Sequence, residues 1–227
     1  MPIRLLLSFL ICLSLNVYSQ KENVSLKFCP LCLVDEVSFP TVQSGIEFSF
    51  SEKLTWYNEF GFKYRKSYYE TADPDTNFIK SAGFKVKTEF RYYTLPGKRK
   101  RFTGEYVAVN AFFIKDDHNT EIDYYYQRDS SLIKSDAFGV EKKVFGINVL
   151  YECQKAITNT IAIDFYFGIG ARFRNVSAVN REYDSNRDGF KGPIDVNIYA
   201  SKQMIEAKGG RSMGANITMG LRLCFSL

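Results

Sequence analysis

Histidine, tryptophan and a surplus of one charge are nearly missing from this chain of 227 residues. It has one His and one Trp, and its 30 Lys and Arg residues nearly balance its 25 Asp and Glu residues. This mild basic excess is not typical of nucleic-acid-binding proteins, so no nucleic-acid partner is expected. After residue 19 the sequence also lacks the run of about twenty apolar residues that a transmembrane helix needs. A membrane location would therefore require a closed sheet, because only helices and barrels satisfy every backbone polar group in lipid.

The first residues have the features of an export signal. Arg4 gives a positive start, Leu5 to Leu15 form an apolar stretch, and Val17 and Ser19 are small residues at the positions that a signal peptidase reads. We therefore predict a signal peptide over residues 1–19 and one mature domain over residues 20–227. The alternative, an N-terminal membrane anchor, is disfavoured because the apolar run is too short to span a bilayer.

From Val42 onward, apolar and polar residues alternate with a period of two. In the last segment one face carries only apolar side chains: Met213, Ala215, Ile217, Met219, Leu221, Leu223 and Phe225. Because successive side chains point to opposite sides of a strand, this pattern predicts a strand of roughly fourteen residues with one apolar and one polar face. Ordinary strands have about five or six residues. Strands of this length behind an export signal favour a membrane-spanning barrel over a soluble sandwich.

The same alternation predicts eight strands joined by alternately short and long connections. The strands cover Val24–Val34, Thr41–Phe50, Leu54–Lys66, Lys80–Thr94, Phe102–Lys115, Phe138–Cys153, Asn159–Arg174 and Ser212–Leu227. Short turns are expected at residues 51–53, 95–101 and 154–158, and long polar loops at residues 67–79, 116–137 and 175–211. Outer-membrane barrels have short periplasmic turns and longer outer loops. The prediction is an all-β fold, an eight-stranded antiparallel up-and-down transmembrane β-barrel.

The polar faces of the predicted strands carry charges of both signs. An Arg or Lys that faces lipid near the bilayer midplane costs about 2–4 kcal/mol, so these faces are predicted to point inward. They carry Glu47, Glu59, Lys63, Arg65, Lys85, Lys87, Glu89, Arg91, Asp164, Arg172 and Arg222. A barrel of eight strands is only wide enough for its side chains to fill, and buried charges persist only when they are paired. We therefore expect a side-chain-filled interior held by salt bridges, without an open pore.

The early strands carry a family resemblance. The segments Lys27–Leu31, Phe39–Phe48 and Glu59–Phe62 resemble the opening of small outer-membrane β-barrel proteins of the Bacteroidota, whose wider relatives are the OmpA- and OmpX-type eight-stranded barrels. The resemblance implies a barrel in the cell outer membrane of a Gram-negative bacterium. It implies no catalytic set, and many members of the group are uncharacterised. The chain has no peptidoglycan-binding domain after the predicted barrel, so a cell-wall anchoring role is not implied.

One polar segment has the spacing of a calcium-binding loop. Oxygen ligands would come from Asp184, Asn186, Asp188 and Asp195 at positions one, three, five and twelve, and from the backbone carbonyl of Phe190 at position seven. A glycine stands at position six, as the motif requires. Position eight is a lysine instead of an apolar residue, and position twelve is Asp where Glu is usual. The alternative is a polar loop rich in turn-forming residues. Calcium is the only candidate cofactor that the sequence suggests.

The single histidine, His118, falls in the predicted loop 116–137. Ser130, Ser131 and Asp117 are close to it in sequence, which leaves a lipid-modifying hydrolase as one alternative. A catalytic histidine needs an orienting partner and a nucleophile, and the sequence specifies neither. A solvated loop histidine is therefore the favoured interpretation, and no enzymatic activity is predicted.

The cysteines of the mature chain are Cys29, Cys32, Cys153 and Cys224. In a strand, the C-x-x-C spacing would send the first two thiols to opposite faces, which disfavours a metal site. An exported chain permits disulfides, and a closed barrel makes its first and last strands neighbours, so a Cys29–Cys224 bridge is one alternative. Free thiols that pack as small apolar side chains are the favoured prediction.

These observations predict a structural or surface-interaction protein of the outer membrane. Its expected partners are outer-membrane lipid and lipopolysaccharide, and the barrel-assembly machinery during biogenesis; it is expected to be a monomer. A small channel and a soluble lipocalin-like ligand carrier are further alternatives. The carrier needs an apolar interior, whereas the predicted interior is crowded with charge.

Overall fold

The computed structural model describes residues 24–34, 40–64, 78–96, 102–191 and 198–226, so the predicted signal peptide lies outside the described residues. The strands are β1 (Val24–Phe28), β2 (Thr41–Ser49), β3 (Leu54–Lys63), β4 (Ala82–Pro96), β5 (Gly104–Tyr125), β6 (Ile133–Ala156), β7 (Ile161–Val179), β8 (Gly189–Phe190) and β9 (Gly210–Ser226). The helical elements are η1 (Pro30–Val34), η3 (Tyr126–Arg128) and α2 (Ile198–Lys208). The fold class is all-β, as predicted.

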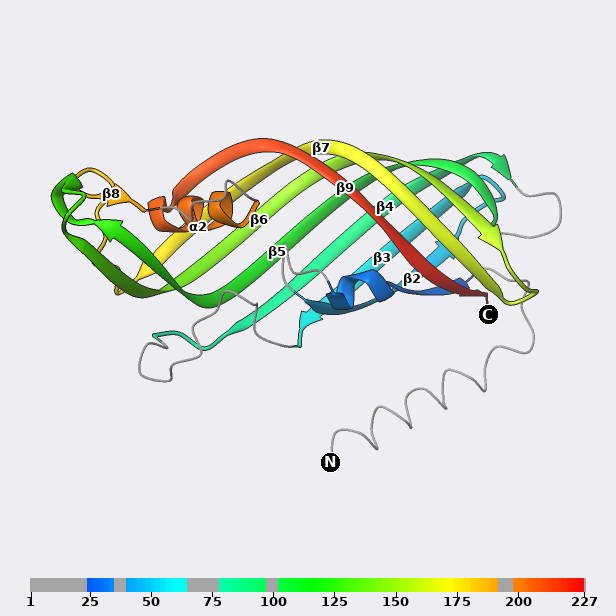
Figure 1. Cartoon of the computed structure of the whole chain (residues 1–227). Helices are drawn as coiled ribbons and strands as arrows, with labels where there is room; N and C mark the ends of the chain where they lie inside the picture. Colours follow the sequence, from blue (N-terminus) through cyan, green and yellow to red (C-terminus); the bar gives the residue numbers. More distant parts are fainter. Residues whose placement is uncertain (1–23, 35–39, 65–77, 97–101, 192–197, 227) are drawn as a thin grey trace, which may run out of the picture.

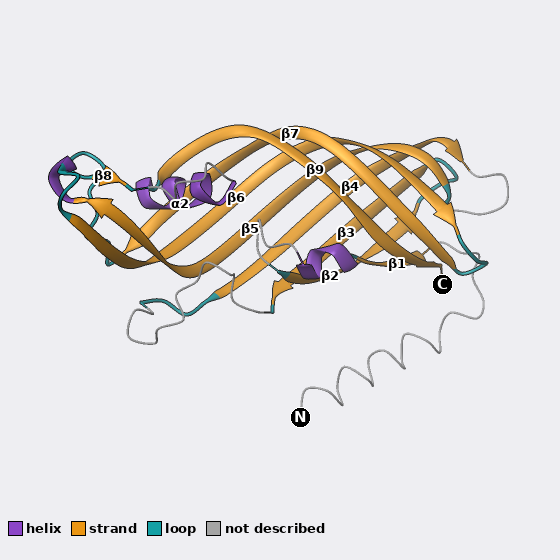
Figure 2. Cartoon of the chain, viewed as in Figure 1, coloured by secondary structure: helices purple, strands orange, loops and turns teal. Residues whose placement is uncertain are grey.

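The described strands pair in one antiparallel sheet that forms a ring. Its order is β4-β3-β2-β1-β9-β7-β6-β5-β8, and β4 also pairs with β5. β1 has β2 on one side and β9 on the other, so the first and last strands are neighbours. Strands make up nearly the whole wall of the ring (Figure 2). We call the end that carries β8 and α2 the loop end, and the opposite end, which carries the C-terminus, the turn end (Figure 1).

The first strand is shorter than predicted. β1 ends at Phe28, and Pro30–Val34 form the short 3-10 helix η1, so the prediction of a strand reaching Val34 is wrong. Pro30 has no N–H to donate to a sheet ladder, and it is therefore unsuited to continue a strand paired on both sides. In the turn that follows, the Cys32 N–H donates a hydrogen bond to the Cys29 carbonyl at 3.3 Å.

β5 and β6 are longer than predicted. They pair in continuous register, from Gly104 opposite Gln154 to Tyr125 opposite Ile133. Most of the predicted loop 116–137 is therefore a β-hairpin. The charges of this segment suggest a loop, but Asp117, Glu121 and Asp123 lie on the outward side of the hairpin, and Asp116 is buried on its inward side. β7 also extends further, to Val179. The hairpin and β7 therefore continue the wall of the ring well past the predicted strand ends.

The two faces of the sheet divide as the alternation predicts. Phe62, Val149 and Phe165 point outward and are 59%, 61% and 50% exposed. Their register partners continue the pattern, because Val109, Val149, Ile169 and Ile217 form an exposed row across β5, β6, β7 and β9. Charged side chains on the opposite face are buried: Glu47, Glu59, Lys87, Glu89, Arg91, Asp164 and Arg222. The ring is therefore apolar outside and charged inside.

The small elements of the long connection before β9 lie at the loop end. β8 pairs with the end of β5, where Phe190 and Gly189 oppose Tyr124 and Tyr125. α2 follows and leads directly into β9 (Figure 1). Within the described ranges, no helix has the length and apolar character needed to cross a bilayer.

Candidate functional site

A network of ion pairs fills the interior toward the turn end. Arg222 on β9 is fully buried, and its guanidinium nitrogens lie 3.2 Å from Glu59, 2.5 Å from Glu89 and 3.0 Å from Glu152. The guanidinium also lies 4.0 Å from the ring centre of Tyr166. These partners belong to β3, β4, β6 and β7, so this one side chain connects five strands across the interior.

A second part of the same network lies around Arg91 and Lys27. Nη1 of Arg91 is 3.1 Å from Glu47, and Nζ of Lys27 is 2.9 Å from Glu47 and 2.8 Å from Asp164. The hydroxyl of Tyr106 donates a hydrogen bond to Asp164 at 2.7 Å. The salt bridges expected from the sequence are therefore present, and aromatic side chains separate and cover them.

Several members of this network were not among the residues predicted from the sequence. Lys27, Tyr106 and Glu152 are all buried inside the ring. Lys27 lies on β1, in register with Cys224 on β9. The sequence predicts that the first and last strands are neighbours, but it does not give the register of this pair. Glu152 already lies within the predicted strand Phe138–Cys153, and its inward position follows from the alternation of that strand.

Not every predicted interior charge joins the network. Lys63 points toward the loop end, where its Nζ lies 3.1 Å from Asp116. Lys85 and Arg172 are only partly buried, and Arg65 lies outside the described residues.

The polarity of the wall inverts at the loop end. On β5 and β6 the inward side chains there are apolar and buried: Ile122, Tyr124, Phe138 and Val140. They pack with Val176, Tyr183 and Ala207, so a small apolar core fills this end of the ring. The outward residues of the same strands are mostly polar: Asp117, Glu121 and Asp123 on β5, and Ser135 and Glu141 on β6.

Between the two cores lies a buried polar cluster around His118. Nδ1 of His118 is 3.3 Å from Asp116 on β5, and Nε2 is 3.3 Å from Glu206 on α2. Nζ of Lys142 on β6 lies 3.5 Å from Asp116 and 3.8 Å from Glu206. His118 itself is only 3% exposed. The cluster therefore links the helix of the last connection to the wall of the ring.

The electrostatics of this cluster favour a charged histidine. Burial alone would lower the pKa of His118, but the carboxylates of Asp116 and Glu206 outweigh it and raise the pKa above the ordinary 6.5. Burial would likewise raise the pKa of Asp116, yet His118 and Lys142 hold it well below its usual range. An imidazolium between two carboxylates serves as a link between elements and cannot act as a general base.

The residues expected beside His118 in a hydrolase do not surround it. His118 is buried in β5, so the prediction of a solvated loop histidine is wrong. Asp117 points outward and pairs with Lys115 at 2.9 Å. The hydroxyl of Ser131 donates to Asp129 at the tip of the β5–β6 hairpin.

The predicted calcium loop is organised around Asp188. Arg187 donates to both carboxylate oxygens of Asp188 at 2.8 Å, and the backbone N–H groups of Gln127 and Asp184 donate to them at 3.0 Å. The bonds from Arg187 lower the pKa of Asp188 well below its usual range. The last predicted ligand, Asp195 at position twelve, lies outside the described residues.

Phe190 belongs to β8, and Asp184 accepts a hydrogen bond from the Asn186 N–H at 2.9 Å. The described part of the chain holds no group of three or more His, Cys, Asp and Glu side chains placed to bind a metal ion. Calcium binding by this loop stays a prediction.

The cysteines correct one further prediction. Cys29 and Cys32 form a disulfide, with their Cα atoms 5.5 Å apart, so both the free-thiol prediction and the Cys29–Cys224 alternative are wrong for this pair. The reason is the turn at Pro30, which removes the strand geometry that would send the two side chains to opposite faces. Cys153 and Cys224 are free thiols.

Comparisons with protein families, with curated proteins and with solved structures find no match. The resemblance of Lys27–Leu31, Phe39–Phe48 and Glu59–Phe62 to small outer-membrane barrels thus stays a prediction. Function has to follow from the chain's own geometry, above all from the inversion of polarity along its wall.

Proposed function

We propose that this chain is an integral outer-membrane β-barrel with a structural or surface-interaction role. The observation that carries the proposal is the inversion of polarity along β5, β6 and β7. Toward the turn end, apolar side chains point outward and charges point inward. Toward the loop end, apolar side chains point inward and polar residues point outward. A change of surroundings from hydrocarbon to water along the wall accounts for both halves.

The size of the exposed apolar surface supports the same placement. Soluble monomers rarely expose contiguous apolar patches larger than a few hundred Å². Here Val109, Val149, Ile169 and Ile217 are each more than half exposed, in one row across four strands. Burial of apolar area is worth roughly 25 cal/mol per Å², so a wall of this kind would favour lipid strongly over water.

The ion-paired interior supports a scaffold more than a channel. Arg91 and Arg222 fill the bore together with five buried carboxylates of β2, β3, β4, β6 and β7: Glu47, Glu59, Glu89, Glu152 and Asp164. A lipocalin-like carrier would need an apolar interior in that place. The hydrolase alternative would need a nucleophile beside His118, whose ring nitrogens both face carboxylates. The loop end, with α2, β8 and the hairpin tip, is then the surface offered to partners outside the cell.

Three measurements test this proposal together. Cell fractionation should recover the protein with the outer membrane, and the folded protein should migrate faster on detergent gels before boiling than after it. The purified protein in planar bilayers should show no steady conductance. Recovery in the soluble periplasmic fraction would contradict the membrane placement, and a reproducible conductance would instead favour the channel.

A further inference from the structure

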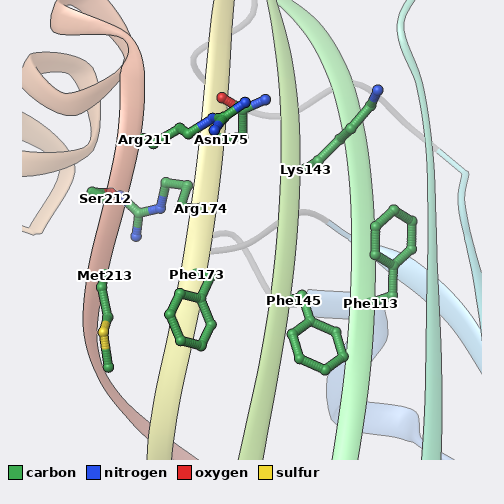
Figure 3. Close-up of a pocket in the computed structure, with 9 residues that line it drawn as sticks. All are labelled: Phe113, Lys143, Phe145, Phe173, Arg174, Asn175, Arg211, Ser212 and Met213. Atoms are coloured by element: carbon green, nitrogen blue, oxygen red, sulfur yellow. The ribbon is translucent and has the colours of Figure 1, made fainter.

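An aromatic row crosses the outer wall near the loop end. Phe113 is in register with Phe145, Phe145 with Phe173, and Phe173 with Met213, so the row runs over β5, β6, β7 and β9. All four side chains are exposed, from 36% for Phe113 to 69% for Met213. They form the lower side of a surface hollow of about 440 Å³ (Figure 3).

A cationic row lies directly beside the aromatic row on its loop-end side. Lys143 is in register with Asn175, and Asn175 with Arg211, each two residues from the aromatic row on the same outward face. These three side chains, with Arg174 and Ser212, form the other side of the hollow (Figure 3). Neighbouring strands are about 4.8 Å apart, so Lys143 and Arg211, two strands from each other, can converge on one anion between them.

Lys143 and Arg211 have no ionic partner within the described ranges of the chain. Among the described residues, Lys143 and Arg211 form no ion pair, whereas the next cation in the row, Lys115, is paired with Asp117 at 2.9 Å. Glu141 lies on β6 two residues from Lys143, toward the loop end, and forms no ion pair with it. The hollow thus combines two cations that form no ion pair with a row of exposed apolar side chains.

We propose that this hollow binds a phosphorylated lipid of the outer leaflet. Its phosphate would lie between Lys143 and Arg211, near the amide of Asn175, and its acyl chains would lie along Phe113, Phe145, Phe173 and Met213. Arg and Lys bind phosphate oxygens by charge-assisted hydrogen bonds, and the aromatic row supplies the apolar contact that a free phosphate would not use. The inference rests on the proposed function, because that placement puts the loop end at the outer leaflet, where lipopolysaccharide carries phosphates beside its acyl chains.

The test compares two double variants by native mass spectrometry of the full mature chain in detergent. The site variant is Lys143→Gln with Arg211→Gln. The control is Lys53→Gln with Lys155→Gln, which removes two exposed cations at the turn end. The probe is bisphosphorylated lipid A, with lipid A stripped of its phosphates as the comparison lipid.

We expect the site variant to bind bisphosphorylated lipid A at least fivefold more weakly than the natural protein, and the control to bind it equally well. Phosphate-free lipid A should bind the natural protein as weakly as it binds the site variant. Equal binding by the site variant and the natural protein would overturn the inference. So would complete displacement of the lipid by an equimolar amount of inorganic phosphate, since the apolar floor would then contribute nothing.

Fractionation and gel migration of the same samples separate this inference from the proposed function. A site variant that folds, reaches the outer membrane and still retains lipid A contradicts only the lipid site. A natural protein that never reaches the outer membrane contradicts the proposed function itself.

Discussion

At the scale of single residues, the interior shows how full burial of a charge is tolerated. Arg222 and Arg91 are both fully buried, and each has carboxylates on more than one side and an aromatic ring against its flat face. Desolvation of an ion costs several kcal/mol, which only good geometry and additional hydrogen bonds offset. The stability of the ring should therefore depend on keeping these pairs complete.

Replacement of Arg222 by Met should destabilise the folded ring by about 3–5 kcal/mol. The change keeps the length of the side chain but leaves Glu59, Glu89 and Glu152 facing one another without their shared cation. Urea unfolding in phospholipid vesicles measures the difference. Lys155→Met at the turn end is the control: it removes an exposed cation and should change the unfolding free energy by less than about 1 kcal/mol. Equal effects of the two changes would contradict a structural role for the network.

The second residue-scale prediction concerns pH. The folded pKa of His118 is above its ordinary 6.5, so the stabilisation that its charge gives to the docking of α2 is complete below about pH 6.5. It is lost as the pH rises through the raised pKa, when the imidazolium loses its proton between two carboxylates. The two carboxylates that face His118 are Asp116 of β5 and Glu206 of α2. The cations that interact with these carboxylates are Lys142 of β6, Lys63 of β3 and Arg174 of β7.

Amide hydrogen exchange in residues 203–208, corrected for the intrinsic effect of pH, measures this docking. Protection should fall as the pH rises, and His118→Gln should flatten the dependence while lowering protection at acid pH. Unchanged protection across the range in the natural protein would show that the charge of His118 does not hold the helix.

At the scale of elements, periodicity predicted the wall strands but missed some strand ends and the turn at Pro30. It located the wall strands and the direction of both faces, because a strand with one apolar and one polar face must alternate strictly between the two residue types. It placed the loop-end limits of β5 and β6 too early, because toward the loop end the inward positions become apolar, the outward positions become mostly polar, and the alternation changes phase. It missed the 3-10 turn at Pro30, and with it the disulfide, because a single proline outweighs the pattern around it.

The elements also approach one another closely where glycine allows it. A Cβ placed on Gly170 of β7 would lie 1.9 Å from the Ile147 carbonyl oxygen of β6, whereas one placed on Gly214 of β9 would have no atom within 4 Å. Gly170→Ala should therefore force the two strands apart and cost about 1–3 kcal/mol, and Gly214→Ala should be nearly neutral. Urea unfolding of both variants measures the contrast. Equal stability of the two would contradict the tight packing of β6 on β7.

At the scale of the whole molecule, the distribution of polar and apolar side chains reverses along the ring. One part has a charged interior and an apolar outer wall, and the other has an apolar interior and a mostly polar outer wall, as soluble proteins do. The charged core and apolar wall toward the turn end suit hydrocarbon outside. The apolar core around Phe138 and Tyr183, with its polar surroundings, suits water. The hollow beside Phe145 and Lys143 lies where the two parts meet, which is where the headgroup of an outer-leaflet lipid would be expected.

A pair of substitutions on one face of β7 tests this division directly. Ile169 and Ser177 both point outward and are both exposed, but Ile169 lies in the apolar band and Ser177 beyond it. In lipid, Ile169→Arg should cost about 2–4 kcal/mol, because an Arg near the bilayer midplane loses its hydration. Ser177→Arg should stay within about 0.5 kcal/mol, as exposed substitutions in water usually do. Equilibrium unfolding of both variants from phospholipid vesicles measures the difference. If both variants were as stable as the natural protein, the wall around Ile169 would be facing water, and a membrane location could not be maintained.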